Sequence, residues 1–121
     1  MSGEEKNLEN RMKKFIETCG GWQVKFHANS FTKTGIPDVL CCVKGRFVAV
    51  EVKASKGRPS PLQIHQLKQI DNAGGYAILL YPDNYDEFKE FIKQLADCNT
   101  SKANLLYRQL KGRWTAYANV T

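Results

Sequence analysis

Three stretches of the chain carry apolar side chains at helical spacing, with polar residues between them. They span residues 4–19, 60–73 and 85–97, and each predicts a helix that buries one face. Glycine pairs at 20–21 and 74–75 follow the first two stretches, and glycines in that place favour the end of a helix. We therefore expect one helix at the start of the chain and two in its second half.

Four other stretches have the alternation or the composition of β-strands. Residues 22–26 alternate between apolar and polar, which predicts a half-buried strand. Residues 39–43 and 46–53 flank a short turn at Lys44-Gly45 and predict a hairpin. Residues 76–81 are continuously apolar, as in a strand buried on both faces. A helix separates this strand from the one before it, so the two should be parallel.

These elements predict an α/β fold, in which helices flank a mixed central sheet within a single domain over residues 1–121. The polar residues 27–34 predict a loop that could approach a substrate. After the third helix, residues 105–107 and 114–117 are rich in Leu, Tyr and Trp and lie on either side of Lys111-Gly112. This pattern predicts an additional hairpin at the end of the chain.

The predicted hairpin brings two carboxylates together. If its turn is symmetric about Lys44-Gly45, Asp38 lies directly opposite Glu51. Opposed residues of an antiparallel pair share a face, with Cβ atoms about 5 Å apart. Lys53 joins that face because residues two apart on a strand point the same way.

Two opposed like charges on a sheet are unfavourable unless a cation lies between them. Mg²⁺ is commonly held by one or two carboxylates, waters and substrate phosphate oxygens. Asp38 and Glu51 are therefore the predicted metal ligands. Lys53 would position or deprotonate the attacking water, or stabilise negative charge in the transition state.

The charge balance agrees with a phosphate-bearing substrate. The formal net charge is +6, which favours a polyanionic partner because Lys and Arg release the counterions condensed on phosphates. Lys56 and Arg58, in a basic loop just after the hairpin, and Lys33, beside Gly35, are the candidate phosphate contacts. An ordinary solvated loop explains Lys56 and Arg58 equally well, and Lys33 is the weaker candidate of the three.

The composition also bears on membrane association and cellular location. The longest apolar runs are far shorter than the ~20 residues of a membrane span, and the first residues lack the apolar centre of a signal peptide. The four cysteines lack metal-ligand spacing, which favours free, buried thiols in a reducing cytoplasm. We expect no membrane association and a cytoplasmic location, in a bacterium or a phage-infected host. His27 and His65 have no partners in sequence that suggest catalysis.

The residues Pro37-Asp38 and Glu51-Val52-Lys53 resemble the active-site motif of the PD-(D/E)XK nuclease superfamily. Over residues 5–81 the chain is similar to its small virus-type VRR-NUC members, with Gly35-Ile36-Pro37-Asp38 and Leu62-Gln63 also in the shared pattern. The resemblance implies a restriction-endonuclease-like core. It also implies a Mg²⁺-dependent or Mn²⁺-dependent enzyme that cuts DNA, often at branched or flapped structures, in DNA repair or recombination, and that is encoded by a mobile or viral genome.

The resemblance also implies roles for further residues. The Val52 carbonyl would complete the metal coordination, and an acidic residue of the first helix would bind a second metal or orient hydrated metal. Glu5 is preferred for that role, and Glu9, one turn later on the same face, is the alternative. Gln63 is either a catalytic-site residue or only the third residue of a capping box that begins at Ser60 with Pro61 next.

The function predicted is a divalent-metal-dependent, structure-selective DNA endonuclease that cuts branched, flapped or four-way DNA. The alternatives are a non-catalytic nucleic-acid-binding domain on the same fold, a ribonuclease, and the nuclease subunit of a larger complex. We also expect a homodimer, because cutting two strands of a junction needs two sites and twofold dimers are the commonest oligomers. Residues 105–117 would supply its interface.

Overall fold

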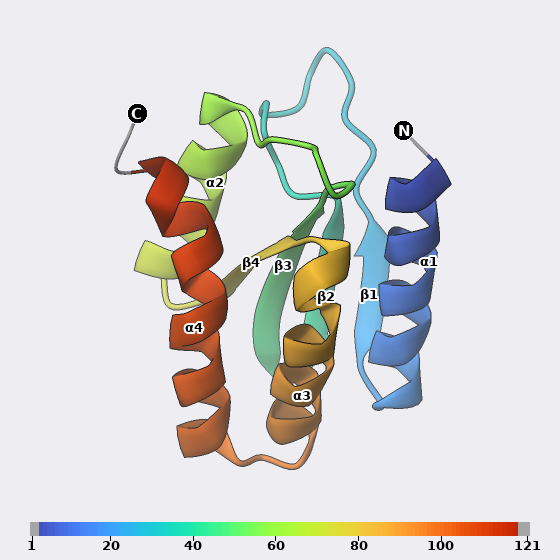
Figure 1. The fold of residues 1–121 in the computed structure, drawn as a ribbon, viewed down its shortest axis with the longest axis vertical. Helices are drawn as coiled ribbons and strands as arrows, with labels where there is room; N and C mark the ends of the chain where they lie inside the picture. The colour runs from blue at the N-terminus through green and yellow to red at the C-terminus, as the bar shows by residue number, and fades with distance from the viewer. Residues whose placement is uncertain (1–2, 119–121) are drawn as a thin grey trace.

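The computed structural model describes residues 3–118 and places one four-stranded sheet among four α-helices (Figure 1). The elements in chain order are α1 (Gly3–Thr18), β1 (Trp22–Lys25), β2 (Val39–Val43), β3 (Arg46–Val52), α2 (Pro61–Asn72), β4 (Tyr76–Leu80), the 3₁₀ turn η1 (Pro82–Asn84), α3 (Tyr85–Ala96) and α4 (Thr100–Ala118). No helix within the described range is long and apolar enough to cross a membrane.

The strands lie in the order β1-β2-β3-β4. The first two pairs are antiparallel, and β3 and β4 are parallel as predicted for the β-α-β unit. The turn between β2 and β3 falls at Lys44 and Gly45, with φ of 50° and 79°. Two positive φ values in a two-residue turn match the twist of a hairpin, and they confirm the predicted turn position.

The sheet separates two hydrophobic clusters. One face of β2, β3 and β4 packs against α1 and α3, and it also contacts the first half of α4. Its centre includes Met12, Val50 and Phe91, all fully buried. The opposite face of β4 packs against α2 and the end of α4, around Leu67, Leu79 and Trp114. The mixed sheet flanked by helices is the predicted fold class, and the predicted order of elements is confirmed through α3.

The predicted C-terminal hairpin is wrong, because residues 100–118 form the single helix α4. Ala103, Tyr107, Leu110 and Trp114 are its buried residues, and their spacing of three and four is helical. The helix also covers the free edge of β4. The Tyr107 hydroxyl accepts the Ala77 N–H at 3.0 Å, and the Trp114 indole N–H donates to the Ala77 carbonyl at 2.8 Å. An open sheet edge exposes unpaired backbone groups. Here Tyr107 and Trp114 satisfy the N–H and C=O of Ala77, as a neighbouring strand would do.

This packing also removes the predicted dimer interface over residues 105–117. Tyr107, Leu110 and Trp114 are at most 8% exposed, because they fill the chain's own core and cover its own sheet edge. Leu105 is the large apolar side chain of this segment that stays open to solvent. Of the four cysteines predicted to be buried, Cys41 is buried and Cys19 is half-buried. The predicted burial is wrong for Cys42 and Cys98, which are exposed.

Candidate active site

The two predicted carboxylates meet at one end of the sheet. Val39 pairs with Val50 in the β2-β3 ladder, and the next step of that register sets Asp38 opposite Glu51. Asp38 Oδ2 accepts the backbone N–H of Val52 at 2.9 Å, which links the start of β2 to the end of β3. The opposition derived from the hairpin pattern is therefore confirmed.

Glu51 is the buried member of the pair, with only 2% of its surface exposed. Its Oε2 accepts a hydrogen bond from Gln63 Nε2 at 3.0 Å and lies 3.5 Å from Lys53 Nζ. Its other oxygen, Oε1, is buried without any hydrogen-bond partner in the described part of the chain. Burial is the main reason that the pKa of Glu51 rises to about 8; the neighbouring Asp38 carboxylate adds to the rise, and Lys53 opposes it.

Asp38 has a different environment. Besides the Val52 N–H, its Oδ1 lies 3.5 Å from Lys25 Nζ, and its side chain is 23% exposed. The sequence suggested that both carboxylates lack compensation when no cation is bound. The structure limits this to one oxygen of Glu51. Asp38 has a backbone donor and a lysine, and Glu51 Oε2 has Gln63 and Lys53, whereas Glu51 Oε1 has no hydrogen-bond partner among the described residues.

Lys25 contacts a site carboxylate, and the sequence analysis did not predict this. Its ammonium donates to Glu9 at 2.7 Å and so lies between that carboxylate and Asp38. Glu9 is 4% exposed and has a second cation, Lys13, at 3.4 Å. Burial lowers the pKa of Lys25, but its bonds to Glu9 and Asp38 outweigh burial and raise it. A signal existed in the sequence, since Glu9 lies beside Leu8 and Met12 on the apolar side of α1.

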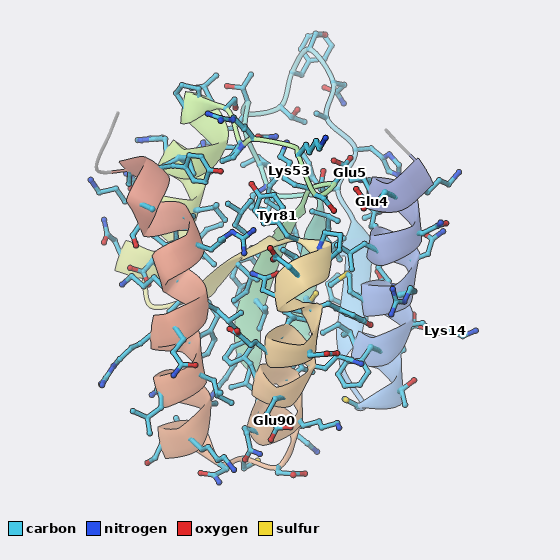
Figure 2. All side chains as sticks on the ribbon, viewed as in Figure 1. Glu4, Glu5, Lys14, Lys53, Tyr81 and Glu90 are labelled. Atoms are coloured by element: carbon cyan, nitrogen blue, oxygen red, sulfur yellow. The ribbon has the colours of Figure 1, made fainter. Side chains whose placement is uncertain are left out.

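The acidic residues of α1 therefore have separate environments. Glu9 is tied to the site through Lys25, while Glu4 accepts the backbone N–H and the hydroxyl of Ser55, both at 2.7 Å. Glu5 is half-buried, at the same end of the molecule as Glu4 and Lys53 (Figure 2). Whether Glu5 or Glu9 takes part in catalysis stays a prediction for the experiment below.

Gln63 contacts both the helix start and a site carboxylate, and its catalytic role stays a prediction. Ser60 and Gln63 form the predicted capping box, in which the Gln63 side-chain oxygen accepts the Ser60 N–H at 2.8 Å. The amide nitrogen of the same side chain is the donor to Glu51. Gly35, with φ of 79°, holds the preceding loop against this helix start; a Cβ there would lie 2.5 Å from the Leu62 carbonyl oxygen, so a larger residue would not fit.

A divalent cation fits the chemistry of this site. The partnerless Glu51 Oε1 is a buried oxygen that a metal would satisfy, and Asp38 supplies a second carboxylate opposite it. The N–H and C=O of one strand residue point to the same neighbouring strand, so the Val52 carbonyl faces the Asp38 side. Within residues 3–118, no three Asp, Glu, His or Cys side chains converge on one point. Water and phosphate oxygens would complete the coordination, as is usual for Mg²⁺.

The three residues predicted to contact phosphate lie in two different loops. Lys56 and Arg58 are exposed in the loop directly after Lys53, and Lys33 is exposed in the loop between β1 and β2. His27 and His65 are exposed, and neither has a hydrogen bond or ion pair with the site carboxylates. Of these residues, Lys56 and Arg58 in the loop after β3 are therefore the best placed to contact a phosphate near Lys53.

Comparison with known proteins gives a limited result. No protein-family model matches the chain, and no curated protein matches it. Among solved structures, it is similar to Hjc, a Holliday junction resolvase from the archaeal hyperthermophile Archaeoglobus fulgidus. The two share 19% sequence identity with a TM-score of 0.48, over 64% of this chain and 69% of that chain. A likeness of this size does not assign a function.

Proposed function

We propose that this chain is a divalent-metal-dependent nuclease of the PD-(D/E)XK type, which hydrolyses phosphodiester bonds in DNA. The observation that carries the proposal is the buried Glu51 carboxylate, whose Oε1 has no partner in the described structure and whose pKa is raised to about 8. Burial and a neighbouring like charge shift the pKa of a carboxyl group, and groups with strongly shifted pKa values cluster at catalytic sites. Glu51 is buried and has Asp38 and Lys53 beside it. The closer likeness to VRR-NUC nucleases is part of the proposal and rests on the motifs alone.

Each residue has a role in this proposal. Asp38, Glu51 and the Val52 carbonyl would hold Mg²⁺ or Mn²⁺, which when bound polarises a phosphoryl oxygen and lowers the pKa of a bound water. Glu51 must lose its proton to act as a ligand, so metal binding should release a proton. Lys53 would orient the attacking water or stabilise the charge on the phosphoryl oxygens, and Gln63 would fix the orientation of Glu51.

We further propose that the substrate is branched, flapped or four-way DNA and that the chain acts as a homodimer. Two cuts in one junction require two sites, and a twofold dimer supplies them. The net charge of +6 supports a nucleic-acid partner. Magnesium is the proposed ion, with manganese as a substitute, and DNA repair or recombination in the cytoplasm of a bacterium or a phage-infected host is the proposed setting.

The test is a cleavage assay with labelled linear, flapped and four-way DNA, with Mg²⁺, with Mn²⁺ and with EDTA. Wild type should cut only with metal, and Asp38→Ala, Glu51→Gln and Lys53→Met should each reduce cleavage at least ~100-fold while still binding DNA. Lys14→Gln is the matched control, since Lys14 is exposed on α1 and its side chain points away from the site (Figure 2). Cleavage in EDTA, or undiminished cleavage by all three variants, would refute the proposal.

The second candidate is a nucleic-acid-binding domain without catalysis, alone or within a larger complex. The ion pair between Lys53 and Glu51 favours it, because a lysine at 3.5 Å already neutralises part of the charge that a metal would meet. Binding of all three DNA substrates without cleavage in either metal would establish this reading. RNA substrates of the same shapes in the same assay would test for ribonuclease activity.

A further inference from the structure

A polar pocket of about 400 Å³ lies beside the candidate active site. Its walls come from the loop after β3, the residue after β4 and the last turns of α4, and its polar lining is Ser55, Lys56, Arg58, Tyr81, Arg113 and Tyr117. Three of these side chains are cations, contributed by segments far apart in the sequence. The pocket therefore brings the end of α4 to the same end of the sheet as Lys53.

The pocket is close to the catalytic lysine by strand register. Val52 pairs with Leu80, and the Lys53 N–H donates to the Leu80 carbonyl at 2.9 Å. Lys53 and Tyr81 are thus next to each other on adjacent strands, which are about 4.8 Å apart. In Figure 2 the Tyr81 label stands just below the Lys53 label.

The pocket wall is held in place before any ligand binds. The Tyr81 hydroxyl donates to the Gly57 carbonyl at 2.9 Å, which fixes the loop to β4. The Arg113 guanidinium lies over the Tyr81 ring, 4.2 Å from its centroid, and binds Asp83 through two hydrogen bonds of 2.7 and 3.0 Å. Arg113 is therefore oriented, while Asp83, whose side chain is 68% exposed, competes for its charge.

We propose that this pocket binds a backbone phosphate of the nucleic acid, next to the phosphate that would be cut at the proposed metal site of Asp38 and Glu51, with Lys56, Arg58 and Arg113 as the anchoring cations. The proposal rests on the proposed nuclease function for its ligand. Arginine forks and lysine charges are the usual partners of phosphate oxygens. The Tyr117 hydroxyl lines the same pocket, 3.4 Å from the Tyr81 hydroxyl. If the pocket binds a phosphate in this way, α4 is part of the substrate-binding surface, although it lies outside the segment with the nuclease-like motifs.

The experiment measures binding of a short labelled single-stranded oligonucleotide in EDTA at several salt concentrations, so that cleavage does not interfere. Lys56→Gln and Arg113→Gln should each weaken binding by about tenfold, or ~1.4 kcal/mol, and should each reduce the slope of log K against log salt by about 1. Lys14→Gln removes the same charge on a distant part of α1 and should change neither quantity by more than about twofold.

Asp83→Asn gives a result of opposite sign that a folding defect would not produce. It frees Arg113 from its carboxylate and should tighten binding by up to about fivefold, since an exposed ion pair is worth up to ~1 kcal/mol. Asp97→Asn is its control, because Asp97 is exposed at the other end of α3, about 18 Å away at 1.5 Å per residue. Equal effects of Asp83→Asn and Asp97→Asn, or of Arg113→Gln and Lys14→Gln, would overturn the pocket assignment.

The two proposals fail separately. Cleavage by wild type combined with control-like binding of the pocket variants would keep the nuclease and overturn the pocket. The full pattern of binding effects without cleavage in either metal would keep the pocket and overturn the nuclease. Displacement of the oligonucleotide by inorganic phosphate at low millimolar concentration would assign the pocket to free phosphate and overturn its assignment to the nucleic-acid backbone.

Discussion

The side-chain amide of Gln63 joins the start of α2 to Glu51, because it accepts the Ser60 N–H and donates to the Glu51 carboxylate at 3.0 Å. Gln63→Glu separates these two functions. Glutamate also completes a capping box, so the helix start should survive, but the donor to Glu51 is replaced by a negative charge. Cleavage should fall about 10- to 100-fold, the usual cost of removing a residue that orients a metal ligand.

Ser60→Ala is the matched control for this change. It removes the cap acceptor and should cost about 1 kcal/mol of stability, while the Gln63 donor to Glu51 stays. Thermal melting and initial cleavage rates of both variants, measured below the melting transition, make the comparison. Equal loss of cleavage in the two variants would mean that Gln63 matters only as a helix cap.

The pH dependence of stability should report the burial of Glu51. Its pKa is about 8 in the folded chain against 4.5 for the ordinary group, so between these values the folded state holds a proton that the unfolded state has lost. The metal-free protein is therefore stabilised by this group below pH 4.5, and that stability is lost as the pH rises to about 8. Glu51→Gln has no such proton, and its melting temperature in EDTA should exceed that of wild type by at least ~4 °C near the upper end of this range.

The same comparison at about pH 5 is the control, since wild type and Glu51→Gln should melt nearly together where Glu51 is protonated. Differential scanning calorimetry across the range provides the curves. A constant offset between the two proteins at all pH values would show that Glu51 does not titrate within this range.

Metal should reverse the loss of stability at high pH. A cation that binds only the folded chain adds about 2.7 kcal/mol at a concentration 100 times its dissociation constant. Because Glu51 must be deprotonated to bind, Mg²⁺ should raise the melting temperature more at about pH 8 than at about pH 6. Glu51→Gln should lose most of this gain, Asp97→Asn should keep it, and EDTA should abolish it. A gain of equal size in all three proteins would place the metal elsewhere.

The hairpin and its carboxylates were predictable because they depend on short-range rules. The turn at Lys44-Gly45 and the two-residue period of a strand fix Asp38 opposite Glu51 without knowledge of the rest of the chain. The partner of Lys25 was not predictable, because it depends on how α1 lies over β1. The backbone donor to Asp38 likewise depends on the geometry at the ends of two strands.

The wrong prediction for α4 has a different physical cause. Tyr, Trp and Thr favour strands on average, and Lys111-Gly112 has the composition of a turn. Tertiary packing overrides both preferences, because a helix here buries Leu110 and Trp114 and lets Tyr107 and Trp114 satisfy the edge of β4. The polar residues of the last turns, which the hairpin prediction left without a role, then reach the pocket beside Lys53.

Melting and cleavage measurements on variants of Glu5 and Glu9 should show which of these two glutamates of α1 takes part in catalysis. Removing one partner of a buried ion pair is strongly destabilising. Lys25→Met should therefore cost about 2 kcal/mol, because it leaves Glu9 with only Lys13 at 3.4 Å and takes the lysine from Asp38. This is less than for a fully buried pair because Lys25 keeps 24% of its side-chain surface exposed. The double variant Glu9→Gln/Lys25→Met removes both charges and should recover much of that stability.

If Glu9 and Lys25 serve the fold, the double variant should cleave DNA within about threefold of wild type when assayed below its melting transition. Glu5→Gln should instead keep the melting temperature within ~2 °C and lower cleavage about 10- to 100-fold, as expected for a residue that orients hydrated metal. Melting curves and cleavage rates of these variants decide between the two glutamates. Loss of cleavage in the double variant with full activity of Glu5→Gln would transfer the role to Glu9, and would make the Glu9-Lys25-Asp38 chain part of the active site.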